Sequence, residues 1–276
     1  KHLRQPKIYI KLPSRGKYWP EGSLNITETG EYPVYAMTAK DEILFKTPDA
    51  LLNGQATVDV IQSCIPDVKD AWKSPSIDMD AMLVAIRMAS YGELLPMKGN
   101  IPGTDIEKEF DLNLQQMLDN YISSEFVDTF KIEGFTVQIQ PISYRTLTQQ
   151  SVKAFEEQRI FQIVNDENAN PAEKLKAFQH SFKALTELNI GIVIESVTAI
   201  QIDGEQEAVV NRNHLREFIQ GAEAKIYNQI TDHIGKEKEK FQQKPIKIEA
   251  TEEEIEKGAP KVYEMPIVFD QSNFFG

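Results

Sequence analysis

The sequence is poor in the residues that disulfides, metal sites and most catalytic motifs require. It has one cysteine and four scattered histidines among 276 residues. A single cysteine excludes an internal disulfide and a thiolate zinc cluster within one chain. The sequence also lacks a glycine-rich phosphate loop, a serine nucleophile elbow, a His-Glu-x-x-His helix and a calcium loop. We therefore expect a protein that is not an enzyme, with no catalytic residues, no metal and no cofactor.

Long apolar runs and an excess of basic charge are missing as well. A membrane helix needs about 20 apolar residues, and the best candidate, residues 190–197, is short and contains Gly191 and Glu195. The first residues, KHLRQPKIYI, contain no apolar signal region, so we expect no export. The net charge is −12, and residues 236–244 alternate lysine with glutamate as on a solvated helix face. Neither a membrane nor a nucleic acid is expected as a partner.

The remaining composition is that of an ordinary folded protein, with 41% hydrophobic and 26% charged residues. A chain of 276 residues can form one large core or two modest ones. We predict an α+β protein of two lobes. Residues 1–143 form a mixed N-terminal lobe with a small β-sheet, short helices and a protruding hairpin near residues 94–113. Residues 144–276 form a mainly helical lobe with an extended C-terminal tail.

Three segments of alternating apolar and polar residues predict the strands of the N-terminal sheet. They are residues 8–12, 34–37 and 135–139, and each is too short to be stable alone, so we expect them to share one sheet. The last segment follows residues 129–132 across a Glu133-Gly134 turn, which predicts a strand pair.

The helical predictions depend on apolar spacing and on capping residues. Residues 78–93 form an amphipathic pattern, and we interpret Asp78 and Asp80 at its start as residues that cap the helix and compensate its dipole, rather than as a catalytic pair. The β-branched run 190–202 is compatible with a helix or a buried strand. A long helix is expected after Asn170-Pro171, with an apolar stripe at helical spacing that we expect in the core: Leu175, Phe178, Phe182, Leu185 and Leu188.

Two aromatic segments are candidates for contact with a partner. In residues 13–22, Tyr18 and Trp19 follow a glycine turn, with Arg15 and Lys17 beside them. Rigid aromatic side chains on a loop are typical binding anchors, although packing onto their own domain is an equal alternative. Phe274 and Phe275 close the chain, and aromatics at a terminus indicate docking onto a neighbour or onto the chain's own core.

The order and spacing of three short segments carry a resemblance to a known family. They are LPSRG at residues 12–16, MTAKDE at 37–42 and IRMASYG at 86–92. Together with FKIEGFTVQIQP at residues 130–141, the helical middle and the Phe-Phe ending, this order resembles the baseplate hub protein family of T-even-like contractile-tailed bacteriophages. Hairpins in that family often carry Cys-x-x-Cys pairs, which residues 94–113 lack, so we expect no zinc ribbon here.

The resemblance implies a hub subunit or a hub assembly factor that works through protein–protein contacts. Its partners would be other phage tail or baseplate hub proteins, in the virion tail or in the host cytoplasm during assembly. Three alternatives stay open. One is a tail assembly chaperone absent from the mature virion, for instance one that binds the tape-measure protein. The others are a homo-oligomer and, least favoured, a cell-wall hydrolase of the tail.

Overall fold

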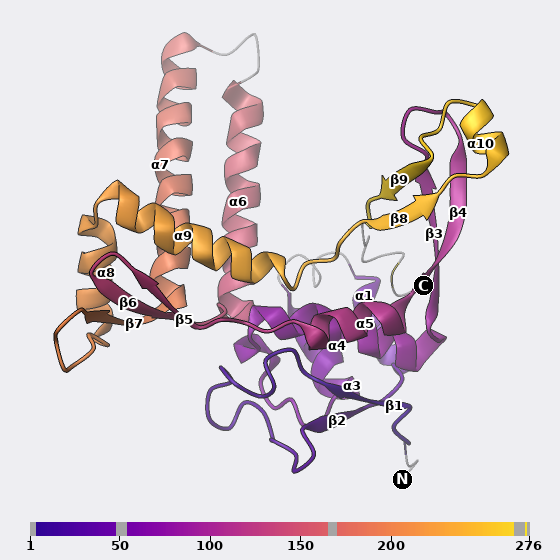
Figure 1. Ribbon diagram of the computed structural model, residues 1–276, viewed down its shortest axis with the longest axis horizontal. Helices are drawn as coiled ribbons and strands as arrows, with labels where there is room; N and C mark the ends of the chain where they lie inside the picture. Colours follow the sequence, from indigo (N-terminus) through magenta and orange to yellow (C-terminus); the bar gives the residue numbers. More distant parts are fainter. Residues whose placement is uncertain (1–3, 48–53, 165–169, 268–273, 275–276) are drawn as a thin grey trace.

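The computed structural model describes residues 4–47, 54–164, 170–267 and 274. Helices and small antiparallel sheets alternate along the chain, and the described part contains four separate sheets (Figure 1). This arrangement confirms the α+β prediction.

The first core lies in the N-terminal part, where helix α4 is buried along most of its length. Short helices surround α4, and the strands β1 and β2 complete this unit. The helices are α1 (Ala39–Phe45), α3 (Gln55–Cys64), the 3-10 turn η1 (Ala71–Lys73), α4 (Ser76–Tyr91) and α5 (Leu114–Ser123). Buried side chains of the first core include Ile10, Tyr32, Val34, Ile61, Met82 and Ile86.

The expected single sheet of three segments is wrong. Within the described residues, β1 (Ile8–Lys11) and β2 (Glu31–Val34) form a two-stranded sheet, with Ile10 opposite Tyr32. β6 (Phe135–Ile139) instead lies between β5 (Thr129–Ile132) and β7 (Val197–Ile202) in a second sheet. Alternation identifies a strand and its buried face, but it carries no information about which strand is the partner. The predicted pair around the Glu133-Gly134 turn is confirmed, because a two-residue turn specifies its own partner.

The second core joins this sheet to helices from the second half of the chain. The run 190–202 is helical to Ser196 and a strand from Val197, so each alternative holds for part of it. The helices that cover the sheet are α7 (Pro171–Ser196), α8 (Arg212–Gly221) and α9 (Ala224–Glu239). Buried side chains of the second core include Val137, Ile139, Val197, Leu215, Ile219 and Ile230.

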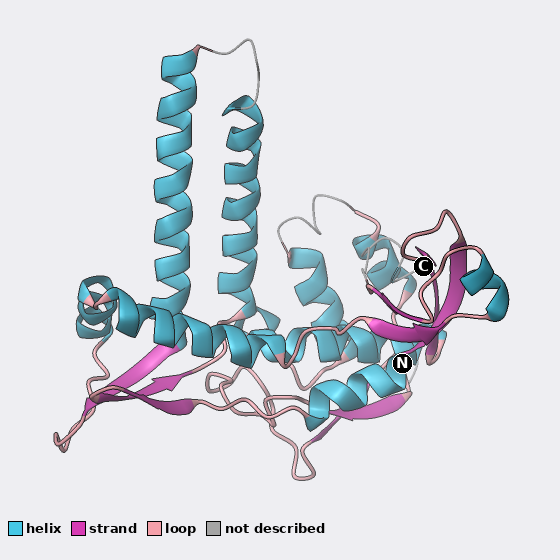
Figure 2. Ribbon diagram, turned by 45° about the horizontal axis from the view of Figure 1, so that its top comes forward, coloured by secondary structure: helices cyan, strands magenta, loops and turns pink. Residues whose placement is uncertain are grey.

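Helices α6 (Tyr144–Val164) and α7 stand side by side and project away from the rest of the protein (Figures 1 and 2). Leu175, Phe178 and Phe182 are exposed on the projecting part of α7. The prediction that the stripe lies in the core is therefore wrong for these three residues, whereas Leu185 and Leu188 are half-buried. Helical spacing shows that residues share a face, whereas only the tertiary structure decides whether another element covers that face.

The C-terminal tail returns to the N-terminal part. β3 (Leu94–Asn100) and β4 (Glu107–Asn113) pair as an antiparallel hairpin, and the tail packs against it to form a third core of Ile101, Ala259, Tyr263 and Met265. The tail consists of β8 (Ile246–Glu249), α10 (Glu252–Glu256) and β9 (Val262–Met265). The hydrophobic clusters thus do not separate at residue 143, and the division into lobes 1–143 and 144–276 stays a prediction.

Candidate protein-binding surfaces

The loop 13–22 begins at a buried proline and exposes its two cations. Arg15 and Lys17 point to solvent, whereas Tyr18 and Trp19 are half-buried. Arg15 has φ 55° and Tyr18 has φ 66°, so two residues that are not glycine adopt the left-handed region. Such residues cost free energy and persist only where surrounding contacts hold the backbone.

Those contacts come from Asp78, which is 0% exposed. Its carboxylate accepts hydrogen bonds from the backbone N–H of Ser14 (2.7 Å), the hydroxyl of Ser14 (2.5 Å) and Nε1 of Trp19 (2.8 Å). Asp78 is not the helix cap, so that part of the interpretation is wrong, whereas its place in the first turn agrees with compensation of the helix dipole. The residue at the cap position is Pro75, and Asp78 is the third residue of the helix, where its side chain reaches the loop.

Burial controls the electrostatics of this carboxyl group. Desolvation raises the pKa of Asp78 from 3.8 to about 6, and the hydrogen bonds from Ser14 and Trp19 oppose the rise. Asp78 lies in the first turn of α4, where the positive end of the helix dipole also favours the charged form. The arrangement fits a structural anchor that fastens the loop to the central helix.

Tyr18 holds the other side of the loop. Its hydroxyl donates to Oδ2 of Asp128 over 2.9 Å, and its ring meets Phe126 edge to face at 5.6 Å. Burial and the Asp128 carboxylate raise the pKa of Tyr18. Both aromatic residues predicted to bind a partner therefore make contacts within their own chain. The partner-binding role of Arg15, Lys17, Tyr18 and Trp19 stays a prediction.

Of the two phenylalanines at the C-terminus, Phe274 lies within the described residues. Phe274 is 6% exposed and packs in the first core, so it docks onto its own chain. That burial makes it a poor candidate for the partner contact expected of it. Phe275 lies outside the described residues.

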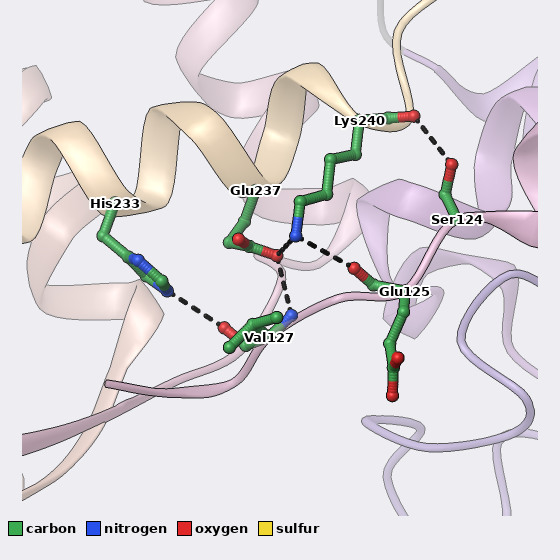
Figure 3. Close-up of polar contacts among 6 residues, drawn as sticks. All are labelled: Ser124, Glu125, Val127, His233, Glu237 and Lys240. Atoms are coloured by element: carbon green, nitrogen blue, oxygen red, sulfur yellow. Dashed lines mark hydrogen bonds and ion pairs between the residues drawn. The ribbon is translucent and has the colours of Figure 1, made fainter. Parts of the chain in front are cut away.

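A polar network holds α9 against the linker that runs from α5 to β5 (Figure 3). Glu237 is 4% exposed, and its Oε2 accepts from the backbone N–H of Val127 (2.7 Å) and from Nζ of Lys240 (2.7 Å). Glu237 belongs to the segment that we interpreted as a solvated helix face, so that interpretation is wrong at this position. Local alternation of charges cannot show that a linker distant in sequence packs over one glutamate.

Further hydrogen bonds extend the network along the linker (Figure 3). Lys240 Nζ donates to the carbonyl of Glu125 (3.2 Å), and Ser124 Oγ donates to the carbonyl of Lys240 (3.1 Å). Nε2 of His233 lies 3.1 Å from the carbonyl of Val127, and the His233 ring stacks on Phe130. These contacts fasten the second core to the linker that comes from the first.

A groove runs between α6, α7 and α8, with a cavity volume of about 630 Å³. Its rim carries an excess of acidic side chains, and Glu157 accepts a hydrogen bond from Ser181 (2.7 Å). Charged residues that line the groove are Lys153, Glu156, Glu157, Glu187, Glu195 and Arg216.

The α7 side of the groove carries Glu187 and Glu195 but is otherwise apolar, and it contains two small residues seven positions apart, Ala184 and Gly191. A Cβ atom at Gly191 would meet nothing within 4 Å, so the groove is open above it. Small residues let another backbone approach closely. The groove can therefore receive a helix that has an apolar face and basic flanks.

Three further features of the described residues concern metal binding, membrane spanning and the single cysteine. No three His, Cys, Asp or Glu side chains among residues 4–47, 54–164, 170–267 and 274 come close enough to hold a metal ion. In the same ranges, no helix is both long and apolar enough to cross a membrane. Cys64 is buried, and burial raises the pKa of its thiol to about 11, which suits a core residue rather than a nucleophile.

Comparison with known proteins gives one match. A family model described as "T4 bacteriophage base plate protein" matches residues 6–257. No curated protein and no solved structure matches the chain. Because the match covers most of the chain, the protein belongs to the T4 bacteriophage base plate protein family and is a phage baseplate protein.

Proposed function

We propose that this baseplate protein is a non-enzymatic hub component, a hub subunit or a hub assembly factor, that binds a helix of another baseplate protein in the groove between α6, α7 and α8. The observation that supports this proposal is the composition of the groove. It combines an apolar wall that includes Gly191 with an acidic rim.

The physical argument concerns complementarity. Glu156, Glu187 and Glu195 attract basic flanks, which favours encounter with a basic helix and disfavours acidic partners. The apolar wall then supplies affinity when it is covered. In a helix interior, glycine costs about 1 kcal/mol relative to alanine. Among the described residues, nothing lies within 4 Å of a Cβ atom added at Gly191. A partner backbone that passes over this position would explain why a glycine stands there.

The test is binding of the purified chain to each purified baseplate protein of the same phage. We expect at least one of them to bind, and we expect Gly191→Phe to fill the groove and weaken that binding at least tenfold. Gly191→Ala is the graded variant, because its single methyl group fills less of the groove than a phenyl ring and should weaken binding less than Gly191→Phe. Absence of any binding, or equal binding by Gly191→Phe and the unmodified chain, would contradict the proposal.

Mass spectrometry of mature tails distinguishes the two roles. A hub subunit is present in the purified tail, whereas an assembly factor is confined to the host cytoplasm. Binding to the tape-measure protein together with absence from the tail would indicate a tail assembly chaperone. A peptidoglycan zymogram tests the non-enzymatic role, and clearing by the purified chain would indicate a cell-wall hydrolase.

A further inference from the structure

Helix α4 contains a buried cation whose hydrogen-bonding groups are not satisfied. Arg87 is 8% exposed, and within the described part of the chain its Nε and Nη1 atoms are buried and have no hydrogen-bond partner. Arginine is rarely buried unless it is paired, because removal of a charge from water costs free energy that only a counter-ion and hydrogen bonds offset. A buried polar group without a partner therefore indicates that something outside the chain satisfies it.

Among the described residues, the groups that contact Arg87 supply no counter-ion. Cζ of Arg87 lies 4.4 Å from the centroid of the Tyr91 ring, and a stacked ring compensates for only part of the lost hydration. The hydroxyl of Tyr91 donates to Oε1 of Glu42 over 2.8 Å, so this carboxylate is bound by the tyrosine. Desolvation lowers the pKa of Arg87, and the opposing contribution comes from Tyr91.

Arg87 lies on the side of α4 from which a partner can approach. Asp80, seven positions earlier, and Tyr91, four positions later, share its helix face, and both are exposed. Tyr91 is 41% exposed, and Leu94, just beyond the end of the helix, is 54% exposed. The guanidinium group therefore lies beneath the outer layer of side chains at the end of α4.

We propose that Arg87 binds the carboxylate of an aspartate or glutamate side chain of another baseplate protein, which docks over Tyr91 and Leu94 at the end of α4. The guanidinium group selects the chemistry of the partner, because hydrogen bonds between an arginine and a carboxylate are charge-assisted and strong. Tyr91 and Leu94 provide apolar surface that excludes water from the pair when the partner covers it. This site is distinct from the groove between α6, α7 and α8, which favours basic flanks.

The stability of the purified chain gives the first test. Arg87→Met keeps a linear side chain that favours helix but removes the charge. We expect the melting temperature to stay the same or to rise, because removal of the desolvated charge offsets loss of the contact with Tyr91. A lower melting temperature, or a variant that does not fold, would show that Arg87 has a structural role and would overturn the proposal.

Binding of each purified baseplate protein of the same phage gives the second test. For at least one of them, we expect Arg87→Met to weaken binding at least tenfold. The matched control is Arg145→Met, because Arg145 also lies over an aromatic ring, 5.1 Å from that of Trp72, but is exposed. The proposal is wrong if no baseplate protein binds, if every binding protein binds Arg87→Met normally, or if both variants lose binding equally.

A double-mutant cycle identifies the carboxylate on the bound protein. Each of its aspartates and glutamates is replaced in turn by the corresponding amide, and binding is measured to the unmodified chain and to Arg87→Met. One substitution should weaken binding to the unmodified chain at least tenfold and should have little effect on binding to Arg87→Met. If Gly191→Phe weakens binding but no carboxylate is coupled to Arg87, the groove is the binding site and the Arg87 site is excluded.

Discussion

The indole Nε1 of Trp19 donates a hydrogen bond of 2.8 Å to Oδ2 of Asp78, and this bond fastens a surface loop to the central helix of the first core. Ser14 provides two further donors to the same carboxylate. The loop 13–22 thus has a fixed conformation despite the left-handed backbone of Arg15 and Tyr18.

Asp78→Asn should change how stability depends on pH. The folded state holds the pKa of Asp78 at about 6, above its ordinary value of 3.8. The folded protein therefore binds more protons than the unfolded chain between about pH 4 and 6. As pH rises through that window, the contribution of Asp78 to the free energy of unfolding decreases. Relative to Asp78→Asn, the unmodified chain should gain about 2 kcal/mol as pH falls from 7 to 4.

Urea unfolding of both proteins at several pH values measures that difference. Asp78→Ala is the second variant, because it removes every acceptor and should destabilise the chain at all pH values. A difference between the unmodified chain and Asp78→Asn that does not vary with pH would contradict a raised pKa.

Trp19→Phe should lower the free energy of unfolding by about 1–2 kcal/mol, because it keeps an aromatic ring but removes the donor to Asp78. Trp19→Ala should cost more, since Trp19 also packs against the first core. Chemical denaturation at neutral pH gives both values. If both variants were as stable as the unmodified chain, the Trp19 side chain would have no structural role and would be available to a partner.

Reversal of the exposed loop charges should affect association rather than stability. Arg15→Glu with Lys17→Glu should leave the melting temperature nearly unchanged and should slow binding to an acidic surface of another baseplate protein. Surface plasmon resonance measures the association rate, and Lys40→Glu, at another exposed lysine, is the control. Equal association rates for the double variant and the control would show that the loop does not contact that partner.

Glu237→Gln should destabilise the chain by about 1–3 kcal/mol. The substitution removes the negative charge that pairs with Lys240 and weakens the acceptor of the Val127 N–H, both of which are bonded to one buried oxygen. Glu239→Gln, at an exposed position on the same helix, should be neutral. Hydrogen exchange at the Val127 amide provides a local readout, and unchanged protection in Glu237→Gln would contradict the role of the network.

Local patterns predicted the elements well and their partners poorly. The hairpin near residues 94–113 and the strand pair around Glu133-Gly134 were predictable because a short turn places its own strands side by side. The partner of β1 was not predictable, because β2 and β6 share the same alternation. Asp78 resembled a capping residue because the residues around it in the sequence indicate the start of a helix. They contain no information about loop 13–22, which packs over Asp78 in the folded protein.

The sequence by itself determined the α+β class, the family and the positions of most helices and strands, because apolar period, turn residues and motif order are local properties of the chain. Only the tertiary structure decided that Asp78 and Glu237 are buried acceptors and that Phe178 and Phe182 are exposed. Burial depends on which distant segment covers a face. A helix that projects from the body leaves its apolar stripe to solvent, whatever the spacing of the stripe predicts.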